Sequence, residues 1–143
     1  MVMRRHGRGA WRLQLRPGAI GQLQRLFEAH SFWARGRRPA ELRRMLWGST
    51  VAVSVWQGSQ LIGFGRASSD GCYRAVLWDV VVAGEQQGRG LGRRIVEGLL
   101  AAPALQSVER VYLMTTNGSG FYRQLGFRSA DSQQLMVKKR SWG

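Results

Sequence analysis

A glycine-rich stretch in the second half of the chain has the residue types and the spacing to bind an anion. It joins the apolar segment 80–83 to a run that reads Gln87-Gly88-Arg89-Gly90-Leu91-Gly92-Arg93. Glycines let the backbone approach a ligand closely, and a helix that begins here would present unpaired N–H groups and the positive end of its dipole. The stretch therefore predicts an anion cradle, with a pyrophosphate as the natural occupant.

Two other phosphate-binding patterns do not fit this stretch. The dinucleotide fingerprint Gly-x-Gly-x-x-Gly would need a third glycine where Arg93 stands. A Walker loop would need a lysine and a serine or threonine after the glycines, and neither follows. Backbone amides are thus expected to hold the anion, with the charges of Arg89, Arg93 and Arg94 beside it.

Few other side chains could do chemistry. Cys72 is the single cysteine, which excludes an intrachain disulfide and suits the reducing cytoplasm where we expect the protein. His6 and His30 are the only histidines, so no Cys/His metal site is expected. A nucleophilic pair would have to join Cys72 to His30, and we expect no catalysis by it.

Asp79 is the one ionisable residue inside the apolar segment 76–82. Strand alternation would place it on the face of Leu77 and Val81, unless a bulge rotates it. Burying a carboxylate costs free energy unless it is paired, so Asp79 is expected to have a specific role. Two roles stay open: a general base, or a member of a structural ion pair that braces the backbone. Weaker candidates for the base are Glu28, His30, Glu41 and Tyr73.

Hydrophobic periodicity predicts the elements that position these groups. Helical spacing predicts helices over 19–30, from Pro39 through 46, from the glycine loop to near Pro103, and over 118–125. Strands are predicted over 11–15, 51–56, 61–65, 73–82, 110–115 and 134–137. The segment 76–82 is nearly all apolar, which predicts a central strand buried on both faces. This order is that of a mixed α/β protein, in which a hairpin meander feeds a βαβ crossover.

The length and the charge of the chain narrow the function classes. The 143 residues suit one compact domain, which we place at residues 11–143 after a disordered basic arm at residues 1–10. A net charge of +14 favours the binding of polyanions. The basic residues are spread along the chain, however, and no nucleic-acid recognition motif accompanies them. Nucleic-acid binding is therefore not expected as the main function. No apolar run approaches the ~20 residues of a membrane span, so no membrane partner is expected.

The glycine run resembles the acetyl-CoA motif of the GNAT superfamily of N-acetyltransferases, Gln/Arg-x-x-Gly-x-Gly/Ala. A second element of that superfamily follows in order, with Asn117 before the motif Phe121-Tyr122-Arg123-Gln124-Leu125-Gly126-Phe127. The resemblance covers residues from about 51 to the C-terminus. It implies an α/β GNAT fold, a central mixed sheet of about six to seven strands flanked by about four helices. It also implies acetyl-CoA as the cofactor and a primary amine as the acceptor.

The resemblance implies a role for each part of the two motifs. Backbone groups of Val80, Val81 and Val82 would bind the pantetheine arm and the acetyl carbonyl. Residues Gln87 to Arg93 would hold the pyrophosphate, and Asn117 would contact the coenzyme from the other side. Tyr122 would act as the general acid that protonates the departing thiolate, because a phenol with a pKa near 10 is a competent donor at neutral pH.

The base and the acceptor are less defined. Relatives often carry Glu or His at the positions of Val76 and Trp78, which are apolar here. Residues 67–82 together with the glycine loop resemble cyanobacterial and chloroplast-type enzymes that act on arylalkylamines such as serotonin and on protein amines. Three alternatives are carried: a small arylalkylamine acceptor, a protein lysine or N-terminal acceptor, and a basic binding module without catalysis. Four aromatic residues could line an acceptor pocket: Phe32, Trp33, Trp47 and Trp56. Pairing as a homodimer is an expectation by analogy alone.

Overall fold

The computed structural model describes residues 1–140, which build one five-stranded sheet. Strands β1 to β4 are antiparallel neighbours, and β4 pairs in parallel with β5. The α/β fold class and the mixed sheet are therefore confirmed, with fewer strands than the expected six to seven. In sheet order the strands are β1 (Val2–His6), β2 (Val51–Gln57), β3 (Gln60–Ser69), β4 (Arg74–Val82) and β5 (Arg110–Tyr112).

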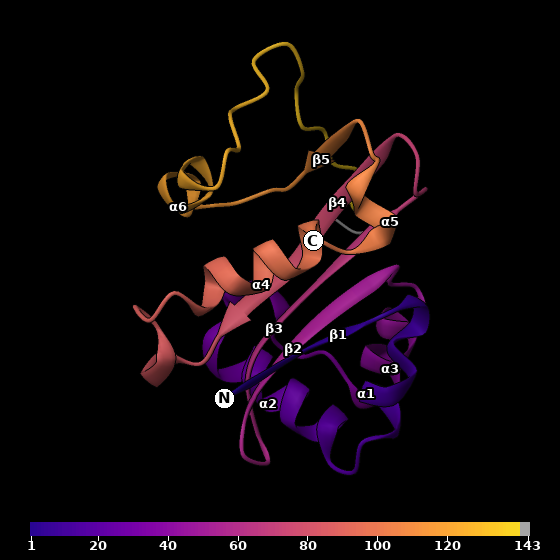
Figure 1. Ribbon diagram of the computed structural model, residues 1–143, viewed down its shortest axis with the longest axis vertical. Helices are drawn as coiled ribbons and strands as arrows, with labels where there is room; N and C mark the ends of the chain where they lie inside the picture. The colour runs from indigo at the N-terminus through magenta and orange to yellow at the C-terminus, as the bar shows by residue number, and fades with distance from the viewer. Residues whose placement is uncertain (141–143) are drawn as a thin grey trace.

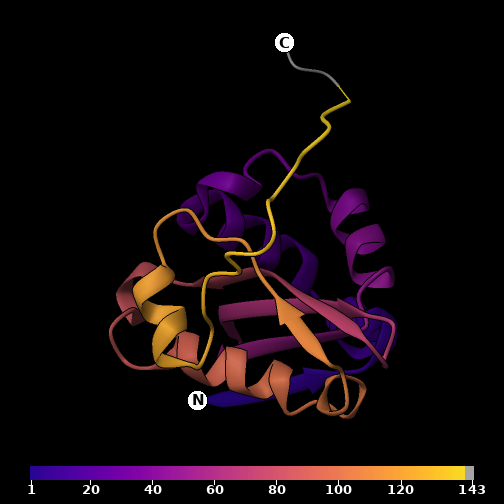
Figure 2. The same cartoon turned by 90° about the horizontal axis from the view of Figure 1, so that it is seen from above.

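Helices cover both faces of the sheet (Figures 1 and 2). On one face lies α2, whose Phe27 ring packs edge-on against Phe64 of β3 at 5.8 Å between centroids. On the other face lies α4, which approaches β3 so closely that a Cβ on Gly65 would come within 2.7 Å of Ile95. The α-helices are α1 (Trp11–Leu15), α2 (Ala19–His30), α3 (Pro39–Trp47), α4 (Leu91–Leu100), α5 (Pro103–Gln106) and α6 (Ser119–Gln124). Short 3-10 turns are η1 (Arg8–Ala10), η2 (Phe32–Ala34) and η3 (Gly84–Gln86).

The N-terminal segment departs from the prediction. Residues 2–6 form the edge strand β1 instead of a disordered arm, in register with β2 over five residue pairs. Its last residue, His6, is buried and lies 2.8 Å from the hydroxyl of Ser54. The predicted strand over 11–15 is the short helix α1, which buries Leu13 and Gln14. Five residues of alternating polarity fit either periodicity, and contacts with distant residues decide between them.

The C-terminal segment also departs from the prediction. Residues 134–137 form no strand, and the side chains of Leu135, Met136 and Val137 are exposed by 70%, 86% and 59%. The neighbouring strand β5 is three residues long, against a prediction that extended to residue 115. The apolar run 135–137 therefore lies outside the sheet.

A bulge interrupts β4 at Asp79 and reverses its alternation. Phe64 pairs with Val81 and Arg66 with Trp78, so the single residue Gly65 faces two residues of β4. Asp79 has φ of +57°, in the left-handed region that Asp tolerates better than most residues. As a result Val81 points to the α2 face of the sheet together with Trp78. Asp79 therefore shares a face with Val81 but not with Leu77, and the bulge that the sequence analysis allowed for is the reason.

The prediction that β4 is buried on both faces is confirmed only in part. Leu77 and Val81 are buried, but Val76, Trp78, Val80 and Val82 are only partly covered. Beyond Val76 no strand pairs with the second edge of β4 among residues 1–140. Of the half-covered valines, Val80 and Val82 line an open space.

Candidate active site

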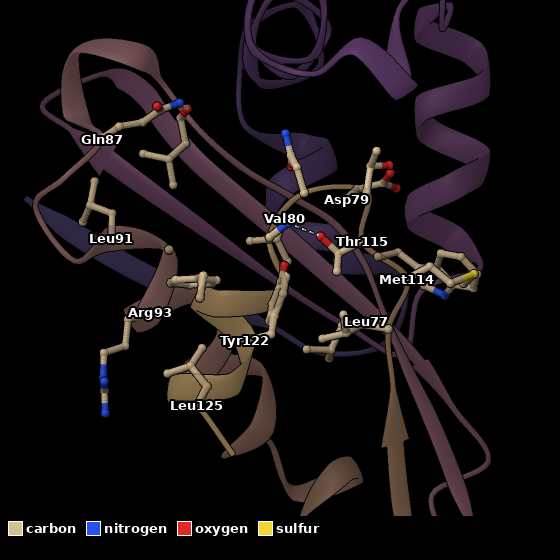
Figure 3. Close-up of a pocket in the computed structure, with 18 of the residues that line it drawn as sticks. Leu77, Asp79, Val80, Gln87, Leu91, Arg93, Met114, Thr115, Tyr122 and Leu125 are labelled. Carbon is tan, nitrogen blue, oxygen red and sulfur yellow. Dashed lines mark hydrogen bonds between the residues drawn. The ribbon is translucent and has the colours of Figure 1, made fainter. Parts of the chain in front are cut away.

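A cavity of about 940 Å³ lies where β4 and β5 separate. The two parallel strands pair only from Arg74–Arg110 to Val76–Tyr112, and the chain after β5 then leads away toward α6. The cavity is walled by β4 on one side and by residues 113–118 and α6 on the other (Figure 3). The backbone edge of β4 after Val76 has no ladder partner on this side within residues 1–140.

The glycine loop closes one end of the cavity and opens helix α4. Gly88 and Gly90 have φ of +82° and +78°, and a Cβ added to either would meet nothing within 4 Å. Gly90 is the N-cap of α4 and provides no side chain to cap it. Within residues 1–140, no hydrogen bond is donated by the amides of Gly88, Gly90, Leu91 or Gly92. This end of the cavity therefore presents bare N–H groups at the positive end of a helix dipole.

Contacts within the chain shape the loop that leads to these amides. The side-chain amide of Gln87 donates to the carbonyl oxygen of Val82 at 3.1 Å, which ties the loop back to β4. The amide of Gly84 donates to Nδ1 of His30 at 3.1 Å, which joins the loop to the end of α2. Arg93 pairs with Glu97 at 2.7 Å and extends away from Tyr122 (Figure 3).

Most of the predicted site residues meet at this cavity. Those that line it are Asp79, Val80, Val82, Gln87, Gly88, Gly90, Leu91, Gly92, Arg93, Asn117 and Tyr122. Val81 does not line it, because the bulge turns its side chain into the core. Arg89 does not line it either, and its guanidinium lies 3.5 Å from the side-chain oxygen of Gln86.

Tyr122 projects from α6 into the middle of the cavity, opposite Val80 (Figure 3). Its ring is half-buried and is held edge-on between Phe121 and Phe127, at 4.9 and 5.8 Å between centroids. Burial raises the pKa of the Tyr122 phenol, so the hydroxyl keeps its proton at neutral pH. Within residues 1–140 the hydroxyl makes no hydrogen bond, which leaves it available to a ligand.

Asp79 lies on the far side of β4 from α4, in a cluster of donors. Its Oδ2 accepts from Nε of Arg66 at 2.8 Å and lies 3.1 Å from Nη1 of Arg37, while Oδ1 accepts from Nε1 of Trp33 at 3.2 Å. Burial alone would raise the pKa of Asp79, but the hydrogen bonds and charges of Arg37 and Arg66 outweigh it and hold the pKa below its usual value. The carboxylate is therefore ionised and paired.

Only part of the predicted aromatic pocket forms. Phe32 and Trp33 line the cavity with their rings at 5.2 Å between centroids. Trp56 is buried in the core, and Trp47 stacks edge-on with Trp11. Sequence reasoning missed several wall residues, most of them in irregular segments without periodicity: Leu113, Met114, Thr115, Phe121, Gln124, Leu125 and Leu135.

The four weaker candidates for the general base do not line the cavity. Glu28 accepts from the amide of Gly36, and Glu41 accepts from the amide of Arg38 at the start of α3. His30 is occupied by the amide of Gly84 as described, and Tyr73 is exposed next to the β3–β4 turn. Cys72 is exposed in the same turn. Among residues 1–140 there is no cluster of three or more His, Cys, Asp or Glu side chains suited to a metal ion.

Known proteins resemble this chain in both sequence and fold. Residues 48–129 match the family described as acetyltransferase (GNAT) domain. The chain is 36% identical over 113 residues to Serotonin N-acetyltransferase 2, chloroplastic, of Oryza sativa subsp. japonica. That match covers 76% of this chain and 56% of the rice protein, so the chain spans about half the length of this relative.

Solved structures show the same fold. A crystal structure from Xanthomonas campestris pv. campestris, described as belonging to the GNAT family, superposes with a TM-score of 0.76 at 26% identity over 97% of this chain and 94% of that one. An aminoglycoside 6'-N-acetyltransferase complexed with coenzyme A superposes with a TM-score of 0.63 at 23% identity, over 79% and 61% of the two chains. The sheet, the split between β4 and β5 and the glycine loop define an α/β acyltransferase-type fold. The chain belongs to the GNAT acetyltransferase family.

The residues of the cavity fit coenzyme A. The bare amides from Gly88 to Gly92 suit the pyrophosphate, and the left-handed glycines leave open the space that a Cβ would fill. The unpaired edge of β4 suits the amide groups of the pantetheine arm, much as an added strand would. Asn117 lines the opposite wall. The volume of about 940 Å³ lies within the upper range of known ligand pockets.

Proposed function

We propose that this chain is an acetyl-CoA-dependent N-acetyltransferase that acts on a primary amine. The observation that carries the proposal is the position of Tyr122, a protonated phenol opposite the unpaired edge of β4, with the bare amides of the glycine loop at the end of the same cavity. The cavity would then hold the diphosphate at the glycine loop and the pantetheine arm along β4, with the proton donor Tyr122 opposite.

Each part of the cavity would have its own task. When bound, acetyl-CoA supplies the acetyl group as a thioester. The amides of residues 88–92 would hold the diphosphate, and the edge of β4 would hold the pantetheine arm on the side that faces Tyr122. The amine nitrogen bonds to the carbonyl carbon as the carbon–sulfur bond breaks. Tyr122 gives its proton to the departing sulfur, and the proton lost by the amine passes to solvent and then back to the phenolate.

The acceptor is proposed to be a small arylalkylamine, such as serotonin or tryptamine. Phe32, Trp33 and Trp78 give the cavity an aromatic wall. Asp79 is the only Asp or Glu on the walls of the cavity within the described residues, and two guanidiniums already pair with it. An acceptor with a second positive charge would therefore find no free carboxylate. The name of the rice relative, a serotonin N-acetyltransferase, supports the same choice.

The competing acceptors are a protein lysine and a protein N-terminus, and the competing class is a basic module that binds without catalysis. A lysine acceptor would bring an apolar side chain into the same cavity, but its polypeptide would lie across a chain with net charge +14. Flanking basic residues in the acceptor would then be repelled. Dimerisation and a location in the cytoplasm stay predictions. No helix within residues 1–140 is long and apolar enough to span a membrane.

A panel of acceptors tests the proposal. Release of free thiol from acetyl-CoA would be measured with tryptamine, spermidine and a lysine peptide as acceptors at equal concentration. We expect kcat/KM for tryptamine to exceed that for spermidine by at least about tenfold, the cost of one poorly compensated charge. Equal rates with all three would contradict the arylalkylamine assignment. If no acceptor is acetylated and nucleic acid binds tightly at physiological salt, the enzyme assignment itself is wrong.

A further inference from the structure

The segment 31–38 forms the aromatic side of the cavity, and its polar links to the sheet converge on one residue. Trp33 and Arg37 both belong to this segment, and both contact the carboxylate of Asp79. Within residues 1–140 no other hydrogen bond or ion pair joins the segment to a strand. Its remaining polar contacts reach helices or turn back on the segment itself, for example from Glu28 to the amide of Gly36.

The bulge in β4 is what brings Asp79 to this segment. Without the extra residue, the side chain would follow Leu77 toward the apolar layer of Ile95 and Leu99 under α4. With it, the carboxylate reaches the α2 side and meets Arg66, which stands on β3 beside Trp78. A non-glycine residue with φ of +57° is strained, and such strain persists only where surrounding contacts hold it.

Both oxygens of the Asp79 carboxylate are contacted by these partners. Its side chain is 5% exposed, compared with 17% for Arg66 and 31% for Arg37. Oδ1 is used by Trp33 and Oδ2 by both guanidiniums. A general base needs a free lone pair directed at the amine and an affinity for its proton. Three donors already contact the two oxygens of Asp79, and Arg37 and Arg66 lower its proton affinity.

We propose that Asp79 is a positioning residue, which fixes Trp33 and Arg37 on β4 and thereby sets the aromatic wall against which the acceptor lies. This inference rests on the proposed function, because it takes the wall of Phe32 and Trp33 as the acceptor side of the cavity. Arg66 holds the carboxylate from the sheet, so that the carboxylate can hold the segment 31–38 in turn. The glycine loop at residues 87–93, where the diphosphate of the coenzyme is proposed to bind, does not depend on this link.

Two substitutions test the link. Asp79→Asn keeps the size of the side chain and its tolerance of a positive φ but removes the charge. Arg37→Met removes one of the two partners in the segment and leaves β4 intact, which guards against a variant that fails to fold. In each variant we expect the KM of tryptamine to rise about tenfold, while kcat stays within about twofold and the Kd of CoA is unchanged. The pH profile of kcat should keep its shape.

Arg38→Met is the matched control, since Arg38 is the neighbouring arginine and its side chain, within residues 1–140, pairs with the exposed Glu41 and not with Asp79. It should leave the KM of tryptamine unchanged. Loss of kcat by 100-fold or more in Asp79→Asn, or loss of the acidic limb of its pH profile, would make Asp79 the base and overturn the inference. An unchanged KM in both Asp79→Asn and Arg37→Met would overturn it as well.

Hydrogen exchange of the backbone amides separates this inference from the proposed function, because it needs no turnover. The segment 31–38 should exchange about tenfold faster in Asp79→Asn and Arg37→Met than in Arg38→Met, with the amides of α4 unaffected. Equal exchange in all three variants would contradict the link, even if the enzyme is active. If the wild-type protein acetylates none of the amines but the exchange differs as expected, the link stands and the proposed function fails.

Discussion

The two ends of the cavity are built in different ways. The end proposed for the coenzyme, called the coenzyme end, consists of the backbone of one continuous stretch, residues 87–93, with glycines where the chain turns. The end proposed for the amine, called the acceptor end, consists of side chains that meet across the fold, such as Trp33 and Asp79, which are 46 positions apart. An end made of backbone should be sensitive to any added Cβ, and an end made of side chains should be sensitive to single charges and donors.

The largest effect is expected at the coenzyme end. Gly90→Glu adds a side chain at φ of +78°, at a cost of about 1–2 kcal/mol, and brings a negative charge to the place proposed for the diphosphate. Together with the lost amide contacts, this should weaken CoA binding by about 1,000-fold or more, measured by isothermal titration calorimetry.

Gly58→Glu is the matched control for this substitution. Gly58 also has a positive φ, +61°, and open space around it, but it lies in the β2–β3 hairpin. The Gly58→Glu variant should be less stable than the wild type but should bind CoA with unchanged affinity. Retained binding in Gly90→Glu would mean that the diphosphate lies elsewhere and that the bare amides of the loop have another role.

A smaller effect is expected where the two ends meet, at Tyr122. Tyr122→Phe removes the phenolic proton but keeps the ring between Phe121 and Phe127. We expect kcat to fall by about 100-fold, the lower range for loss of a general acid, with the Kd of CoA unchanged. Because burial raises the pKa of Tyr122, wild-type activity should show no alkaline loss from this group below pH ~10.

Tyr112→Phe provides the comparison, since Tyr112 lies on β5 and lines a separate, smaller cavity. Its turnover should equal that of the wild type. If Tyr122→Phe turns over at the wild-type rate across the pH range, the phenol is a packing residue and the leaving thiolate takes its proton from water.

The same contrast explains what the sequence could reveal. The glycine run and the Phe-Tyr-x-x-Leu-Gly-Phe motif are local patterns, and they predicted that Gly88, Gly90 and Tyr122 lie in one cavity. Helix α2 and the strands β2 to β4 were predicted because their hydrophobic periodicity is long enough to be unambiguous. The two predicted short strands, 11–15 and 134–137, failed because a few residues fit more than one structure.

The acceptor end could not be predicted in the same way. The bulge at Asp79 depends on the register between β3 and β4 and on the glycine at position 65, and no local pattern marks it. Alternation alone therefore assigned the wrong face to Asp79. Its partners come from two separate parts of the chain, Trp33 and Arg37 from the segment 31–38 and Arg66 from β3, and the chain has 22 basic residues from which to choose. Only the folded structure shows which residues contact Asp79.

The smallest effect concerns stability and its dependence on pH. At pH 7, Asp79→Asn should lower the free energy of unfolding by about 2 kcal/mol, the contribution of hydrogen bonds to a charged group whose partners are partly exposed. Asp79 has a pKa lowered below its ordinary 3.8, so its contribution is complete above that pH and is lost as the pH falls through the lowered value. The two stability curves should therefore run parallel at higher pH and converge below pH 3.8.

His6 provides the internal reference for this experiment. Burial, with the nearby charges of Arg4 and Arg12, lowers the pKa of His6 from 6.5 to about 4. Between these two values the unfolded chain binds a proton that the folded chain does not, so both proteins should lose stability together, by about 3 kcal/mol in total, as the pH falls from 6.5 to 4. Chemical denaturation of both proteins at a series of pH values measures the two windows. A gap between the curves that closes already between pH 6.5 and 4 would show that Asp79 takes up its proton well above pH 3.8 and is not held ionised by Arg37 and Arg66. The acceptor end of the cavity would then lack the fixed charge of Asp79 on which its geometry depends.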